Sequence, residues 1–248
     1  MSAGTSATAT PTPGTGHYVT PELPYKPRAL SRGEATSREI FVFYSPRNQR
    51  IVTVCEYLHL ALAMQLEFTP TLTTYVERPC RLALGPKQTI DVAFWTRDKS
   101  GESGKTGQER FLLAIPKAGT VGNARDSTAL RDRARMEGAA ERHGIHLTYI
   151  VEQELLAAST QLRTHFLLLP HVQSARRVLA RTTIRQGLLA YFNTMPRASF
   201  QQLTAAFDNF SPDHVVAVAA AMVHEGGLRL VDSAPLSLHT MLEVTHAA

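Results

Sequence analysis

The amino-acid sequence predicts an α/β fold with an α/β/α arrangement around a mixed sheet, followed by an all-α segment. Strand-like and helix-like patterns alternate up to about residue 160, which is typical of helices that cover a sheet. No strong strand pattern occurs over residues 154–225, where helical spacing dominates. The chain has 248 residues, 44% of them apolar, which is enough for one large or two modest domains.

Charge and cysteine content indicate the cellular setting. The net charge of +5 suits a polyanionic partner such as DNA. Two cysteines, Cys55 and Cys80, give no disulfide framework, which favours a reducing compartment. The sequence contains no run of 18 apolar residues, and its first residues lack the charged start and apolar middle of a signal peptide. We therefore expect a cytoplasmic protein with no membrane segment.

Composition divides the chain into three segments. Residues 1–35 are rich in Ser, Thr, Ala, Gly and Pro, which predicts a flexible tail. The prolines in TPELPYKPRAL also favour an extended arm that packs on the body. Residues 36–160 form the predicted α/β domain, and residues 161–248 form the second domain.

The α/β domain begins with a predicted strand at residues 39–45 and a helix within Ile51 to Leu66. Thr53 is the expected N-cap of this helix, and Glu56 then has the position of a capping-box glutamate. The strands that follow are predicted at residues 72–84, 87–98 and 111–115. A polar loop at 98–109 precedes the last of these, and a helix at 125–143 and a strand at 145–151 complete the domain.

The second domain is predicted from helix signals. Helices are expected at residues 153–169 and 171–192, separated by Pro170, and at 200–207 and 212–225. Ser199 is the expected N-cap of the third helix, and the last has Ser211 at its N-cap and Gly226 after its end. A short strand, LRLVD, follows.

This order of helices and a short strand indicates a winged helix-turn-helix module. Helix 212–225 contains no Lys or Arg, which argues against base reading in the major groove. The preceding arginines are better candidates for contacts with DNA phosphates, although a solvated basic surface explains them equally well. They are Arg176, Arg177, Arg181 and Arg185.

Three residues of the first domain are candidates for a nuclease centre. Asp91 lies on one predicted strand, Lys117 lies at the end of the next, and Glu56 lies on the helix before them. Carboxylates hold Mg²⁺, and a lysine can orient the attacking water. A typical centre places an acid or amide two residues before the lysine, on the same sheet face; here that residue is Ile115. The hypothesis requires Asp91 and Lys117 to share a face, and otherwise this stretch is an ordinary α/β core.

The ordered series RIVTVCEYLHLALAMQLEFTPTLTTYVERP, IDVAFW and a strand that ends in lysine resembles the TnsA family of heteromeric-transposase endonucleases. The helical HVVAVAAAMVHEGGLRLVDSAPLSLHT adds to the likeness, which covers residues 38–245. The resemblance implies a restriction-endonuclease-like domain, a winged-helix domain and Mg²⁺, with Mn²⁺ as a substitute. It also implies cleavage at the 5′ ends of a transposon, beside a DDE transposase (TnsB-like) and an AAA+ regulator (TnsC-like).

Carried over residue by residue, the resemblance makes Glu56, Asp91 and Lys117 catalytic. It makes Glu56 and Asp91 metal ligands, with the backbone carbonyl of Ile115 in the third position. Ile115 departs from the family pattern, so a second hypothesis is an adaptor that binds DNA, transposase and regulator without cutting. A third is a winged-helix transcription regulator with an α/β sensor domain, which the lack of basic residues on helix 212–225 disfavours.

Overall fold

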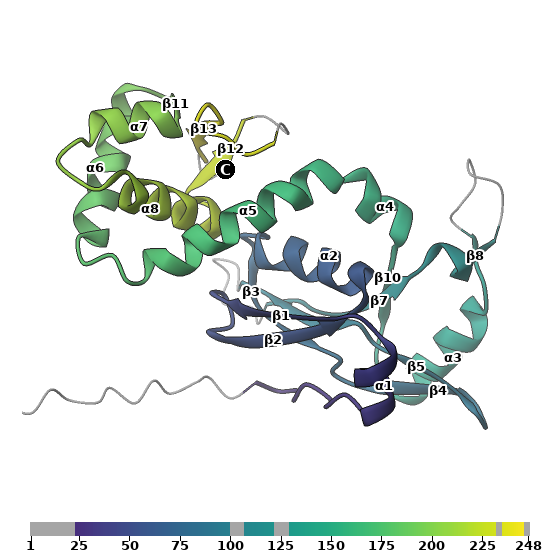
Figure 1. Ribbon diagram of the computed structural model, residues 1–248. Coiled ribbons are helices and arrows are strands. Elements are labelled where there is room, and N and C mark those ends of the chain that lie inside the picture. Colours follow the sequence, from purple (N-terminus) through teal and green to yellow (C-terminus); the bar gives the residue numbers. More distant parts are fainter. Residues whose placement is uncertain (1–22, 100–106, 122–128, 232–234, 246–248) are drawn as a thin grey trace, which may run out of the picture.

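The computed structural model describes residues 23–99, 107–121, 129–231 and 235–245. Its central sheet has four strands in the order β10-β7-β6-β3 (Figure 1). The strands are β3 (Leu72–Glu77), β6 (Phe94–Asp98), β7 (Glu109–Ile115) and β10 (Leu147–Val151). β10 runs parallel to β7, and the other neighbouring pairs are antiparallel. The mixed α/β architecture expected from the sequence is therefore confirmed.

Helices cover both faces of this sheet (Figure 1). α2 (Glu56–Glu67) is built from good helix formers, and its residues 60–64 are buried in one core with Leu112 and Ala114 of β7. On the opposite face, Met136 of α3 (Arg133–Arg142) packs against Leu113 and Ile115. Alternate residues of β7 thus point to opposite sides of the sheet, as the pleat requires.

Smaller elements surround the sheet. Two hairpins, each a two-stranded antiparallel sheet, are formed by β1 (Ile40–Ser45) with β2 (Arg50–Cys55) and by β4 (Arg81–Gly85) with β5 (Gln88–Asp91). The remaining pieces are the short helices α1 (Arg32–Ser37) and α4 (Glu152–Ala157), the 3-10 turn η1 (Lys117–Gly119), and the two-residue strands β8 (Thr120–Val121) and β9 (Ala129–Leu130).

The C-terminal part contains four helices and a second sheet. The helices are α5 (Ser159–Ala175), α6 (Arg181–Thr194), α7 (Phe200–Ala206) and α8 (Pro212–Glu225). The strands are β11 (Arg197–Ser199), β12 (Leu228–Leu230) and β13 (Met241–Val244), arranged β11-β13-β12. The expectation of an all-α segment is therefore wrong: only β12 carried a strand pattern, because β11 and β13 are three and four residues long and acquire their partners from distant segments.

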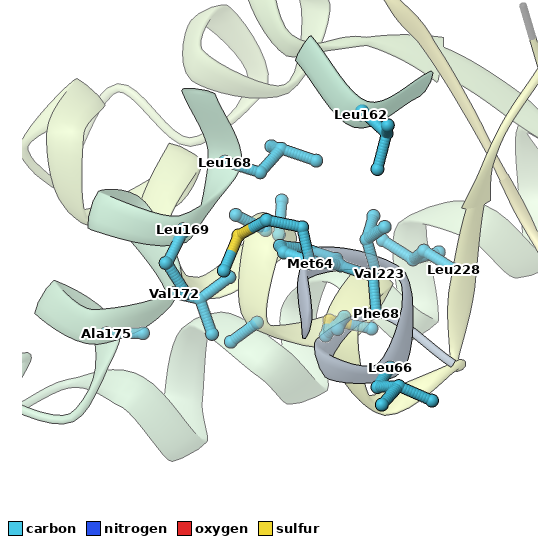
Figure 2. Packing of buried hydrophobic residues seen from close by; sticks show 14 of the residues in the cluster. Met64, Leu66, Phe68, Leu162, Leu168, Leu169, Val172, Ala175, Val223 and Leu228 are labelled. Carbon is cyan, nitrogen blue, oxygen red and sulfur yellow. The ribbon is translucent and has the colours of Figure 1, made fainter. Parts of the chain in front are cut away.

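α5 joins the two parts. It lies over α2 on one side and against α8 on the other (Figure 1). Figure 2 shows the core at this junction, where Met64 and Phe68 meet Leu168 and Val172 of α5 and Val223 of α8. One continuous apolar cluster thus runs from the central sheet into the C-terminal helices. The domain boundary expected at residues 160/161 falls inside α5.

Several predicted elements need correction. The helix predicted within Ile51 to Leu66, with Thr53 at its N-cap, begins only at Glu56, because RIVTVC is rich in β-branched residues and pairs with β1 as a strand. Cys55, not Thr53, is the N-cap, and no side chain caps α2. The strand predicted at 87–98 is interrupted at residues 92 and 93. As a result, Ala93 and Phe94 both lie in the core on the α2 side.

Two further differences concern helices. Pro170 does not separate two helices but lies within α5, where its ring is exposed and Leu168, Leu169 and Val172 keep the helix packed. The helix predicted at 125–143 is shorter, beginning at Arg133; residues 122–128 lie outside the described residues. No helix in the described part of the chain is long and apolar enough to cross a membrane.

Candidate functional site

A small cavity lies between the N-terminal segment, the start of α2 and the strands that carry Asp91. Its volume is about 40 Å³. The carboxylates among its lining residues are Glu34, Glu77 and Asp91, and the guanidinium groups are those of Arg28, Arg38 and Arg78. His59, whose pKa is lowered by burial, also lines the cavity. Alternating charges of this kind make the cavity the candidate functional site of the α/β part.

Asp91 ends β5 and holds two arginines. Its Oδ2 accepts hydrogen bonds from Arg28 Nη2 at 2.7 Å and from Arg81 Nη2 at 2.9 Å, and its Oδ1 accepts one from Arg81 Nε at 2.7 Å. Both arginines also donate to Glu34 Oε1, at 2.8 Å from Arg28 and 2.7 Å from Arg81. Two carboxylates and two guanidinium groups thus form a closed, charge-balanced cluster, which we call the arginine cage (Arg28, Glu34, Arg81 and Asp91).

Local structure fixes Glu34 in the cage. Ser31 caps α1, its Oγ accepting from the Glu34 N–H at 3.2 Å, and the Glu34 carboxylate accepts from the Ser31 N–H at 2.8 Å. This is a complete capping box. The pKa of Glu34 is well below its usual value because Arg28 and the Ser31 backbone donate to the carboxylate. Burial alone would raise the pKa of Asp91, but the bonds from Arg81 and Arg28 outweigh burial and lower it.

Glu56 lies just outside the cavity. Its neighbours Cys55 and His59 line the cavity wall, while its own side chain is 49% exposed and forms an ion pair with Arg38 at 3.4 Å. Its backbone is left-handed, with φ of 68°, which is strained for a residue with a side chain. Glu56 and Asp91 therefore approach the same cavity from different sides without sharing a described contact.

Ile115 and Lys117 are placed away from the cavity. The side chain of Ile115 is buried against Leu113 and Met136, on the α3 side of the sheet. Lys117 is exposed on η1, where its backbone N–H donates to Glu152 Oε2 at 2.7 Å. Neither residue lines the cavity that contains Asp91. The structure therefore brings Asp91 near the α2 start but does not bring Lys117 to it.

The residues around the cavity do not fit a divalent cation. Mg²⁺ needs several free oxygen ligands in near-octahedral geometry, yet both oxygens of Asp91 accept from guanidinium groups. On the α2 side of β7 the last strand residue is Ala114, and the extended backbone of Pro116 continues this alternation. Neither side chain can bind a metal or replace a lysine. Within the described ranges, no group of three or more His, Cys, Asp or Glu side chains could hold a metal ion.

The four arginines proposed for DNA phosphates do not act as one surface. Arg181 and Arg185 both form ion pairs with Glu225 of α8, and Arg176 donates to Tyr44 and Gln49. Arg177 is exposed and forms no ion pair with any residue that the structure describes. Two of the four thus fasten α6 to α8, and only Arg177 is fully available to a ligand.

α8 is buried along most of its length. From Val215 to His224 every residue except Val216, which is half-buried, is buried. The exposed residues of α8 are its first three, including Asp213 and His214, and its last, Glu225. α5 lies against this helix (Figure 1). The described conformation therefore offers no helix face of α8 for the major groove of DNA.

The partners of Asp91 were not predicted from the sequence. Residues 1–35 were expected to be flexible, but the part from residue 23 packs on the body, in line with the alternative of an extended arm; residues 1–22 lie outside the described ranges. One signal was present: Ser31 and Glu34 have the spacing of a capping box. Arg28 carries no local signal, because it meets Asp91 only through the tertiary fold. Arg81 lies directly opposite Asp91 across the β4–β5 hairpin.

A second missed cluster lies where the two parts of the chain meet. Glu67, the last residue of α2, is fully buried and accepts hydrogen bonds from Ser45 Oγ, Tyr75 OH and the Arg47 N–H. His224 of α8 lies 2.8 Å away, measured from its Nε2 to Glu67 Oε1.

No protein-family model matches the chain, and no curated protein matches it.

Proposed function

We propose that this protein is a non-cutting, TnsA-like adaptor that binds DNA, a DDE transposase and an AAA+ regulator. The observation that carries the proposal is the state of Asp91, whose two oxygens are bound by Arg28 and Arg81. A carboxylate whose two oxygens both accept from guanidinium groups is already paired with positive charge, which disfavours a metal ion at the same oxygens. The resemblance over residues 38–245 supports the family, the transposition partners and a cytoplasmic, nucleoid-associated location.

In this proposal the α/β part is a restriction-endonuclease-like domain. The mixed sheet covered by α2 and α3, with Asp91 beside the start of α2, supports this assignment. The C-terminal part is a winged helix: α6, α7 and α8 with the three short strands have the required order. Because α8 is covered, this domain is proposed to dock proteins and DNA backbone rather than to read bases.

Lys117 and Ile115 are consistent with a lost reaction. Neighbouring residues of a strand point to opposite faces of the sheet, so a shift of one position moves a side chain to the other face. Ile115, two residues before Lys117, packs on the α3 side, while the cavity side receives Ala114. An acid or amide and a lysine are thus missing from the face that a cutting centre would use.

Transposition in the presence of the partner transposase and regulator tests the proposal. We compare the wild type with Glu56→Gln, Asp91→Asn and Lys117→Ala, and use Asp98→Asn as a control for folding. The adaptor predicts that the ratio of cut-and-paste to cointegrate products stays the same in all four variants. A shift to cointegrates in the three site variants, with the Asp98→Asn control unchanged, would show that this chain cuts the 5′ strands.

The second candidate is the Mg²⁺-dependent endonuclease subunit itself, which nicks the 5′ ends during excision. The left-handed backbones of Glu56 and Arg78, with φ of 68° and 46°, favour it, because strained residues cluster at active sites. Arg78 lines the cavity and Glu56 adjoins it. The same transposition experiment separates the two candidates.

A further inference from the structure

The N-terminal segment of residues 23–38, here called the strap, is tied to the body by apolar contacts at one end. Leu23 and Tyr25 pack on the cluster on the α3 side of the sheet. The Tyr25 ring lies 5.2 Å from that of Trp95 and 5.4 Å from that of Phe111, measured between ring centroids. The strap therefore begins with a fixed anchor.

Backbone contacts bring the strap to the cavity. The Arg28 N–H donates to the Arg78 carbonyl at 3.0 Å, and Arg78 Nε donates to the Arg28 carbonyl at 3.0 Å. Arg28, Leu30, Glu34 and Arg38 then form one wall of the cavity, opposite Asp91 and the start of α2. The strap thus lies over the carboxylate that a nuclease would use.

The arginine cage has the charge arrangement of a cation held between carboxylate ligands. Each of the two guanidinium groups bridges Asp91 and Glu34, so two positive charges balance two negative ones. Charge-assisted bonds of 2.7 to 2.9 Å are among the stronger protein hydrogen bonds. The side chains of Asp91 and Glu34 are 20% and 14% exposed, so water screens them only partly.

We infer that the strap is an internal occupant of this site: Arg28 of the strap, together with Arg81 of β4, takes the place of a cation beside Asp91, and the docked strap excludes a divalent metal ion and a DNA phosphate. The inference rests on the proposed assignment of the cavity as a nuclease-like site. Asp91 is accordingly a strap anchor, and its loss releases residues 28–38 rather than a metal.

Hydrogen exchange of the full chain, followed by mass spectrometry of peptides from residues 23–38, tests the anchor. Asp91→Asn and Arg28→Gln are each expected to speed exchange in the strap about tenfold, because each removes charge-assisted bonds. The double variant is expected to exchange no faster than the more affected single variant, since both changes break one contact. The matched control is Asp98→Asn, since Asp98 binds Arg110 and is 21% exposed.

Metal exclusion is measured separately, from the free Mn²⁺ signal in electron paramagnetic resonance. The wild type is expected to bind no Mn²⁺ at millimolar concentration. One Mn²⁺ bound by the wild type and lost in Asp91→Asn would overturn the inference. Strap exchange that is unchanged in both Asp91→Asn and Arg28→Gln would also overturn the inference. Arg28 lies outside the sheet, so its variant tests the contact without altering a strand.

These results are independent of the transposition products. If strap exchange depends on Asp91 and the assembled transposase still cuts 5′ strands through this subunit, the adaptor function alone is overturned. A strap that does not depend on Asp91, in a protein that never cuts, would overturn the inference alone.

Discussion

Glu67 ties the α/β part to α8 through one buried carboxylate. Burial alone would raise its pKa, but hydrogen bonds from His224, Ser45 and Tyr75 outweigh burial and lower it. A buried carboxylate is tolerated only where its oxygens are satisfied. This role was not predictable from the sequence, because a glutamate at a helix end is usually exposed.

Replacement of Glu67 tests this contact. Glu67→Gln is expected to lower the free energy of unfolding by about 3 kcal/mol, because His224 and the Arg47 N–H lose a charged acceptor in a buried place. Urea unfolding measures the change. Glu137→Gln is the control: Glu137 is 52% exposed, so its ion pair with Arg133 contributes less than about 1 kcal/mol. Equal losses in both variants would contradict the role of Glu67.

His165 predicts a pH dependence of stability. Its ring stacks on Phe68 with centroids 4.4 Å apart, and burial, helped by His224, lowers its pKa to about 4. The unfolded chain therefore takes up this proton first, near pH about 6.5, and stability falls as the pH drops from there to the folded pKa. The maximum loss is about 3 kcal/mol.

The measurement is urea unfolding at about pH 7 and about pH 4.5. In His165→Phe, which keeps an aromatic ring against Phe68, the loss between these pH values is expected to be smaller by about 2 kcal/mol. The pKa of Glu67 is lowered in the folded state. Its contribution to the free energy of unfolding is therefore lost only as the pH falls below the usual glutamate pKa. An unchanged pH dependence in the variant would exclude His165 as the group responsible.

The start of α7 and both ends of α8 were predictable from the sequence. α8 begins at Pro212 and ends before Gly226, and α7 begins after a complete Ser199 to Gln202 capping box, because these signals are local. The start of α2 was not predictable: helical spacing from Cys55 onward overlapped a strand whose partner lies in β1. Tertiary pairing decided between the two patterns.

Gly226 closes α8 where it meets the rest of the chain. Its φ is 86°, and a Cβ atom there would lie 2.5 Å from Cβ of Pro70. Gly226→Ala is therefore expected to cost about 2 kcal/mol or more in unfolding free energy, from backbone strain and the clash. Thermal and urea unfolding measure the loss.

Gly138 provides the matched control. It lies within α3, where the nearest atom to an added Cβ is Arg142 Nη1 at 3.8 Å. Gly138→Ala is expected to stabilise by about 0.5–1 kcal/mol, since alanine favours the helix. A Gly226→Ala variant as stable as the wild type would show that the α8 end does not need the left-handed residue.

The sequence predicted the class of the molecule better than its site. Alternating strand and helix signals sufficed for a mixed sheet with helices on both faces. Most of the cage was not predictable from the sequence, because Arg28 and Glu34 lie 63 and 57 positions from Asp91 and join its cluster only in the fold. Arg81 is the local member, opposite Asp91 across the β4–β5 hairpin. The side of β7 occupied by Ile115 also depends on the packing of α3.

The shared core predicts cooperative unfolding of the whole chain. The cluster that contains Met64, Leu168 and Val223 includes helices of both parts (Figure 2). Far-UV and near-UV circular dichroism are therefore expected to report one coincident thermal transition. Two resolved transitions would show that the parts fold independently.

The proposed DNA contact predicts a difference between neighbouring arginines. Arg177→Ala is expected to weaken binding of duplex DNA and to reduce the slope of log affinity against log salt by about 1. Arg181→Ala is expected to leave that slope unchanged, because Arg181 is bound to Glu225. Fluorescence anisotropy across a salt series measures both, and equal slopes for the two variants would contradict the assignment.

The pleat of β7 supplies a criterion for recognising relatives that cut. In this chain Ala114 faces the α2 side at the strand end, and Pro116, whose backbone is extended, is the next position of the same alternation. A homologue with glutamine or glutamate at the first position and lysine at the second would carry the reactive pair, and a homologue with neither would share the reduced role. The residues at positions 115 and 117, including Lys117, do not distinguish relatives that cut from relatives that do not.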